Sequence, residues 1–111
     1  MIQSKLSFTP SADAELRRLA SDPSKKDILK QVNRTLGYLE TDLRSPSMQT
    51  HEFKSLTRRY GKKVFEAYAQ NDTPRAFRVF WFYGPDEKDV KGKRVPIITI
   101  VAITPHPQNN N

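Results

Sequence analysis

The chain has 111 residues, no cysteine, and 19 lysine and arginine residues against 12 acidic residues, which gives a formal net charge of +7. This length suits a single domain, predicted over residues 1–107 with a polar tail at 108–111, and the lack of cysteine excludes disulfides, thiolate metal sites and a cysteine nucleophile. The start shows no signal-peptide pattern, and the longest apolar run, residues 97–103, is too short to span a membrane, so we expect a cytoplasmic protein.

The positive charge is distributed unevenly along the chain. Residues 1–45 carry a net charge of +2, and residues 46–111 carry a net charge of +5. A positive field over one part of a small domain favours polyanionic partners. The basic residues of the segment 54–63 make nucleic acid the favoured partner, although the same charges also fit a solvated surface that only keeps the protein soluble.

The first half of the chain predicts one strand followed by two helices. Leu6 and Phe8 alternate with polar residues, as in a short strand. Thr9 and Asp22 are each followed by proline, which predicts an N-cap with a proline in the first helical turn. Apolar residues recur at helical spacing over about 10–20 and again after the second cap. Two helices with so short a break predict an antiparallel helical hairpin.

In the second half the apolar period changes from that of helices to that of strands. Residues 46–63 are polar and predicted to be irregular. The last predicted strand is apolar on both faces, which is typical of a strand covered on both sides. The order β-α-α-β-β-β predicts an α+β domain with a helical hairpin packed on a small, mainly antiparallel sheet. The predicted strands and connections are strand 64–69, turn 71–74, strand 76–83, charged loop 84–94 and strand 97–104.

Three segments, taken in this order, resemble the RelE/ParE superfamily of type II toxin–antitoxin toxins. The resemblance extends over about residues 6–107 and implies the RelE-like fold. It depends on EFKSL at 52–56, FRVFW at 77–81 and IVAITPH at 100–106. Within the superfamily, the RelE arm is similar to ribosome-dependent mRNA endonucleases, and the ParE arm is similar to inhibitors of DNA gyrase that lack the nuclease residues.

The favoured function is that of the RelE arm. The resemblance implies a toxin that cleaves mRNA on the ribosome through attack by the 2′-hydroxyl and is held inactive by a cognate antitoxin protein. The chain contains no glycine-rich phosphate loop, metal-ligand spacing or nucleophile elbow, so no cofactor, metal or small-molecule ligand is predicted. The alternatives are a ParE-like gyrase inhibitor without enzymatic activity and a non-toxic basic module that binds RNA.

Metal-free RNA cleavage needs a base, cations that stabilise the phosphorane, and an acid for the leaving oxygen. By the resemblance, Glu52 is the base, with the adjacent His51 as a rival, although both residues also fit an ordinary exposed loop. Arg78, on an aromatic strand, is the candidate phosphate clamp, and pairing with Glu66 across the sheet is its alternative role. His106 is the candidate acid, although Pro107 follows it where some relatives have tyrosine.

The candidate RNA-binding residues are five basic side chains and one aromatic ring. Lys54, Arg58, Arg59, Lys62 and Lys63 are expected to attract phosphate, either as specific contacts or as a solvated basic loop. Tyr83, at the end of the aromatic strand, is the candidate for stacking on a base. The other aromatic residues of this strand are expected in the core, and the sequence does not decide which face of the strand is buried.

Overall fold

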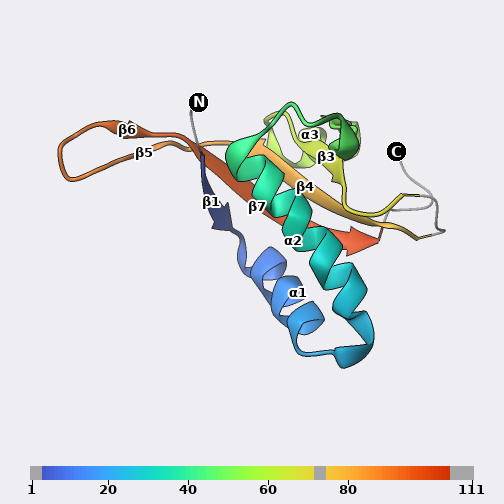
Figure 1. Ribbon diagram of the computed structural model, residues 1–111. Helices are drawn as coiled ribbons and strands as arrows, with labels where there is room; N and C mark the ends of the chain where they lie inside the picture. The colour runs from blue at the N-terminus through green and yellow to red at the C-terminus, as the bar shows by residue number, and fades with distance from the viewer. Residues whose placement is uncertain (1–3, 72–74, 106–111) are drawn as a thin grey trace.

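The centre of the protein, in a computed structural model that describes residues 4–71 and 75–105, is a mixed five-stranded sheet (Figure 1). The first two strands of the sheet run parallel and the other neighbours antiparallel. This arrangement confirms the predicted α+β class. The predicted tail at 108–111 lies outside the described residues. In order across the sheet, the strands are β1 (Lys5–Phe8), β7 (Ile97–Pro105), β4 (Phe77–Tyr83), β3 (Phe65–Tyr68) and β2 (His51–Glu52).

The predicted helical hairpin covers one face of this sheet (Figure 1). It consists of α1 (Pro10–Ala20) and α2 (Lys26–Thr41), joined through the 3-10 turn η1 (Pro23–Lys25). Within residues 4–71 and 75–105, no helix is long and apolar enough to cross a membrane. The core between hairpin and sheet contains, among others, Leu19, Val32, Leu36 and Leu39 from the helices and Val79, Trp81, Ile98 and Ile100 from the sheet.

The starts of α1 and of η1, the turn that leads into α2, are capped at the residues that the sequence predicts. The Thr9 hydroxyl oxygen accepts a hydrogen bond from the Ala12 amide at 3.2 Å. The Asp22 carboxylate accepts hydrogen bonds from the Ser24 hydroxyl at 2.7 Å and from the Ser24 amide at 2.9 Å, and these bonds lower the pKa of Asp22. Because each cap satisfies amides that have no partner within the helix, the two Thr/Asp-Pro pairs set where the helical segments begin.

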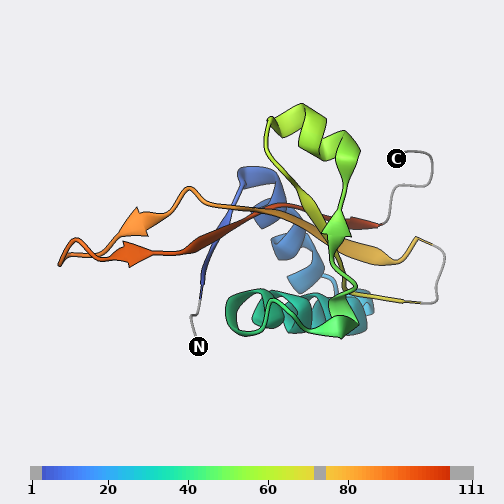
Figure 2. The same ribbon diagram turned by 90° about the horizontal axis from the view of Figure 1, so that it is seen from above.

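The opposite face of the sheet is covered in part by a third helix, α3 (Lys54–Tyr60). Figure 2 shows α3 and α2 on opposite sides of the strands. Beneath α3 lies a second apolar cluster that includes Phe53 and Phe80, whose rings lie 5.0 Å apart. The aromatic strand is therefore buried on both faces, because Trp81 packs toward the helical hairpin and Phe80 toward α3.

The prediction of irregular structure at 46–63 is wrong, since this segment contains the 3-10 turn η2 (Pro46–Met48), β2 and α3. Helix α3 has only seven residues, too few to show an apolar period. A helix this short is not stable alone and depends on packing against the sheet. Gly61, with a φ of 73°, ends it in the left-handed conformation that glycine adopts most readily.

The charged segment 84–94 is also more ordered than predicted. It contains a second, two-stranded sheet formed by β5 (Glu87–Lys88) and β6 (Arg94–Val95). Figures 1 and 2 show this hairpin projecting beyond the body of the protein as a continuation of β4 and β7. Elsewhere, the predicted strands at 64–69, 76–83 and 97–104 agree with β3, β4 and β7 to within one residue at each end.

Candidate functional site

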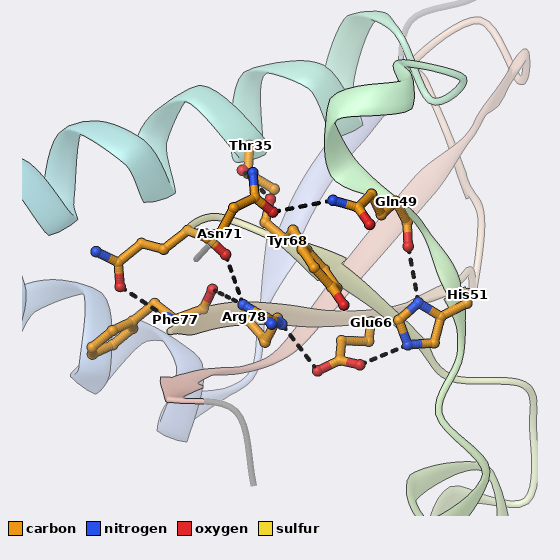
Figure 3. A network of polar contacts seen from close by, with 9 residues as sticks. Thr35, Gln49, His51, Glu66, Tyr68, Asn71, Phe77 and Arg78 are labelled. Atoms are coloured by element: carbon orange, nitrogen blue, oxygen red, sulfur yellow. Dashed lines mark hydrogen bonds and ion pairs between the residues drawn. The ribbon is translucent and has the colours of Figure 1, made fainter. Parts of the chain in front are cut away.

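Four polar side chains from three neighbouring strands meet on the face of the sheet opposite the helical hairpin (Figure 3). His51 in β2 lies directly opposite Glu66 in β3. Two residues further along β3, Tyr68 lies opposite Arg78 in β4. Residues paired across strands, and residues two apart on one strand, point to the same face of a sheet. The strand register therefore brings these four side chains together on the face where Phe80 packs beneath α3.

Glu66 is the centre of this network. Its side chain is 1% exposed, and each of its carboxylate oxygens faces a basic partner. His51 Nε2 lies 2.7 Å from Oε1, and Arg78 Nε lies 3.4 Å from Oε2. A buried carboxylate without partners would cost several kcal/mol, on the order of the desolvation of one ion. The two basic side chains offset this cost and hold the carboxylate in one position.

His51 connects the buried network to the surface, because about half of its side chain is exposed. Its Nδ1 lies 2.9 Å from the Gln49 carbonyl oxygen, and its Nε2 faces Glu66. Both ring nitrogens therefore face oxygen acceptors. A neutral imidazole has one N–H group, so only the doubly protonated ring donates to both acceptors at once. The ring therefore connects the buried Glu66 carboxylate to a backbone carbonyl near the surface.

Arg78 is held on several sides, with 8% of the residue exposed. Its Nη1 donates to the Gln70 carbonyl at 2.7 Å and to the Phe77 carbonyl at 3.3 Å. The guanidinium carbon lies 3.6 Å from the centre of the Tyr68 ring, which is a close cation–π contact. The structure thus contains the pairing with Glu66 that is the alternative to a phosphate clamp. The guanidinium is therefore engaged within the protein by Glu66 and by the Tyr68 ring.

Glu52 does not join this network, because it pairs with Phe65 and so follows the other face of the sheet. Glu52 and His51 nevertheless line one cavity of about 240 Å³, together with Phe53 and Lys54. Strand β2 is the edge of the sheet, where side chains of both faces reach the same solvent space. The cavity therefore brings together a carboxylate, an imidazole and an ammonium group.

A group of basic side chains lies next to this cavity, on α3 and the turn that follows it. All five members are exposed, and no ion pair joins any of them to an acidic residue in the described parts of the chain. Lys62 Nζ lies 4.6 Å above the centre of the Phe82 ring. Their unbalanced charge makes this edge of the sheet attractive to phosphate. This α3 basic group is Lys54, Arg58, Arg59, Lys62 and Lys63.

Two other candidates lie apart from the cavity. Tyr83 is 58% exposed, and its ring contacts Phe65 and Trp81, which follow the face of the sheet that the helical hairpin covers. It therefore lies on the opposite face from the His51 network, at the base of the β5–β6 hairpin. His106, the candidate acid, lies outside the described residues. Across residues 4–71 and 75–105, no three His, Cys, Asp or Glu side chains form a metal-binding group.

The sequence reasoning missed Tyr68 and gave Glu66 only the role of a partner for Arg78. One signal was available in the strand segment Phe65–Tyr68, where a glutamate stands between apolar residues. A charged residue that such a strand buries needs a charged partner on the neighbouring strand. The register with β2 was not available, because the two-residue strand carries no alternation from which to predict it.

The fold is thus a helical hairpin on one face of a mixed, mostly antiparallel sheet, with a polar network at the edge of the other face. The chain is similar to the solved structure of the YoeB dimer from Staphylococcus aureus, with a TM-score of 0.58 and 14% identity over 95% of this chain and 99% of that chain. At this identity the likeness shows the fold. No family model and no curated protein matches the chain. The chain has the fold of the YoeB structure, and this confirms the RelE-like fold that the sequence resemblance implies.

Proposed function

We propose that this protein is the toxin of a type II toxin–antitoxin system and that it cleaves mRNA on the ribosome without a metal. The observation that carries the proposal is the pairing of His51 with the buried Glu66 beside a cavity that Glu52 and Lys54 also line. A base, an acid and a cation are the groups that this reaction needs. The likeness to YoeB supports the toxin class, and the cavity supports the chemistry.

In the proposed reaction, Glu52 accepts the proton of a 2′-hydroxyl, and the freed oxygen attacks the adjacent phosphorus atom. The bond from phosphorus to the 5′ oxygen breaks, which leaves a 2′,3′-cyclic phosphate on one product. His51 gives its Nδ1 proton to the departing 5′ oxygen, which takes the place of the Gln49 carbonyl. The Nε2 proton stays on the ring and donates to the Glu66 carboxylate, and Lys54 offsets the negative charge that builds on the phosphorane.

Arg78 has a positioning role in this proposal rather than a catalytic one. It pairs with Glu66 and stacks on Tyr68, so it fixes the carboxylate that orients His51. A histidine held by a carboxylate keeps one orientation while its other nitrogen faces the substrate. His106 remains the second candidate for the acid, as the resemblance implies, and its substitution belongs in the same assay.

The α3 basic group would hold the RNA beside the cavity, since exposed lysine and arginine side chains bind phosphate without regard to sequence. The same charges would attract an acidic antitoxin segment in the absence of ribosomes. We propose that this segment, extended and partly helical, wraps the sheet and the helices and so keeps the toxin inactive.

Primer extension on a reporter mRNA in a translating extract tests the proposal. The parent protein should produce discrete cuts, and H51Q should abolish them because glutamine keeps a hydrogen-bond donor near Glu66 but transfers no proton. E66Q should weaken the cuts, because the histidine loses the charged partner that orients it. E40Q, at an exposed position on α2, is the matched control and should cut like the parent. Intact mRNA with the parent protein, or normal cutting by H51Q, contradicts the assignment.

A second candidate function is a gyrase inhibitor without enzymatic activity. One observation favours it: the Arg78 guanidinium is engaged within the protein by two carbonyls, a carboxylate and an aromatic ring. If the parent leaves mRNA intact, inhibition of DNA supercoiling by purified gyrase would establish this alternative. Binding of RNA without cleavage or gyrase inhibition would instead indicate a non-toxic RNA-binding module.

A further inference from the structure

The β5–β6 hairpin, residues 84–96, has no evident role in the fold. This segment, here called the arm, leaves the sheet between β4 and β7 and points away from both α3 and the helical hairpin (Figures 1 and 2). Residues 85–94 are all exposed, and Val90 at the tip is fully so. An isolated two-stranded hairpin is only marginally stable in water. Because residues 85–94 are all exposed, the shape of this part of the arm must depend on polar contacts.

The base of the arm is fixed to the sheet by hydrogen bonds. The Gly84 amide donates to the Ile97 carbonyl at 2.8 Å, and the Thr99 hydroxyl donates to the Gly84 carbonyl at 2.7 Å. The Asp86 carboxylate accepts from the Ile97 amide at 3.1 Å. The arm therefore leaves the sheet in a defined direction.

The tip is closed by a tight turn around one carboxylate. Asp89 Oδ1 accepts hydrogen bonds from the Lys91 amide at 2.8 Å and from the Lys93 amide at 2.9 Å. Gly92, with a φ of 79°, takes the left-handed position that such a turn requires. The turn therefore presents its lysine side chains outward on a preorganised backbone.

The acidic side chains of the arm are used within the protein, while most of its lysines are not. Asp86 pairs with Arg94 at 2.7 Å, Glu87 pairs with Lys5 at 3.3 Å, and Asp89 binds the two amides of the turn. Three cations remain without an ion pair to any acidic residue in the described parts of the chain. These three arm lysines are Lys88, Lys91 and Lys93.

The strand register adds to this positive charge. Lys88 lies directly opposite Arg94 in the β5–β6 pair. Like charges at opposed positions destabilise a strand pair, and the single carboxylate of Asp86 offsets only the Arg94 charge. A hairpin selected for its own stability would avoid this pairing. An anion bound at this position would reduce the repulsion between the two positive charges.

We propose that the arm is a second RNA-binding element, which contacts the phosphate backbone through Lys88, Lys91 and Lys93. Lysine is depleted at protein–protein interfaces, where aromatic residues are enriched, and residues 85–95 contain no aromatic residue. Contacts from exposed lysines on a preorganised backbone are instead typical of binding to phosphate. Tyr83, exposed at the base of the arm, is placed to stack on a base of the same RNA.

This inference deepens the proposed function by naming a second contact with RNA, away from the cleavage cavity. The two claims fail separately. If the parent cleaves mRNA and the arm does not contribute to RNA binding, the proposed function is supported and the arm proposal is rejected. If RNA binding depends on the arm but no cleavage occurs, the arm proposal is supported and the nuclease function is rejected.

Fluorescence anisotropy with a labelled RNA hairpin, measured over a series of salt concentrations, tests the arm. The variant K88Q/K91Q/K93Q changes only exposed side chains, and K26Q/K30Q/R34Q on α2 removes the same charge elsewhere. The slope of log affinity against log salt is negative, and the arm variant should reduce its magnitude by about 2 to 3, since each phosphate contact contributes roughly 0.7–0.9. The α2 variant should leave the slope near that of the parent.

Two outcomes would overturn the arm proposal. If both variants reduce the magnitude of the slope equally, only the net charge matters and the arm is no specific contact. A polyglutamate peptide can also be compared with unlabelled RNA of equal charge as a competitor that displaces the labelled RNA. If the peptide displaces the RNA from the parent as well as the unlabelled RNA does, but displaces it less well from the arm variant, the arm fits an acidic protein partner such as an antitoxin.

Discussion

The His51 network and the arm use charge in opposite ways. In the network, a carboxylate that is 1% exposed faces a histidine and an arginine, and the arginine is also stacked on a tyrosine. In the arm, the carboxylates close a turn or pair at the base, and three lysines project into solvent. Buried charges contribute to stability only as a complete set, whereas exposed charges are available to a partner. Substitutions in the network should therefore affect folding, and substitutions in the arm should affect binding.

The largest effect is expected from E66A. This change leaves the Arg78 guanidinium buried without its carboxylate, which should lower the free energy of unfolding by about 3–5 kcal/mol. Urea denaturation followed by circular dichroism measures the loss, and E66Q, which keeps an acceptor oxygen and the volume, should lose less. A loss from E66A of less than about 1 kcal/mol, as at an ordinary surface site, would show that the pair is not a buried one.

A smaller effect is expected at the Tyr68 ring. Y68L should remove the cation–π contact with Arg78 and reduce stability by about 1–2 kcal/mol. A double-mutant cycle with R78M separates this contact from the general loss of packing. If the two substitutions are additive, the ring and the guanidinium do not interact energetically.

The arm provides the contrast. K88Q/K91Q/K93Q should change the free energy of unfolding by no more than about 0.5 kcal/mol, because these exposed side chains have no ion pair in residues 4–71 and 75–105. The same urea measurement checks this. A large destabilisation would mean that the lysines support the fold, and the division between a structural network and a binding arm would then be lost.

The smallest effect is expected at Asp22, a partly exposed cap outside both regions. Its pKa is lowered in the folded state by hydrogen bonds from the Ser24 side chain and amide. Its contribution to stability is therefore complete above the unfolded-state pKa and is lost as the pH falls through the folded-state pKa. D22A should have a slightly lower melting temperature than the parent at neutral pH, and this difference should disappear in acid. A difference that persists in acid would mean that the carboxylate charge is not the source.

The sequence predicted the parts of the fold that repeat a local pattern. The starts of α1 and of η1, which leads into α2, follow from Thr9 and Asp22, each before a proline, and the long strands follow from their apolar residues. The prediction failed for residues 46–63, because β2 has two residues and α3 has seven, and neither is long enough to show an apolar period. These short elements exist because Phe53 and its neighbours pack beneath α3 against Phe80. That packing is a tertiary contact, which no local pattern records.

The candidate site was predicted in its residue types more than in its geometry. The sequence indicated Arg78 and its pairing with Glu66, and it left His51 and Glu52 as rivals for one role. The register of β2 with β3 gives them different positions: His51 meets the buried carboxylate, and Glu52 lies on the other side of the strand. A shift of one residue would exchange them, and a two-residue strand offers no pattern by which to choose the register.

The most direct test of the central claim is the chemistry of the RNA ends after incubation of the parent protein with translating ribosomes. Attack by the 2′-hydroxyl predicts a 2′,3′-cyclic phosphate on the upstream fragment and a 5′-hydroxyl on the downstream fragment, with neither product formed by H51Q. Fragments with a 3′-hydroxyl and a 5′-phosphate would contradict the mechanism, and uncut mRNA would contradict the nuclease function itself.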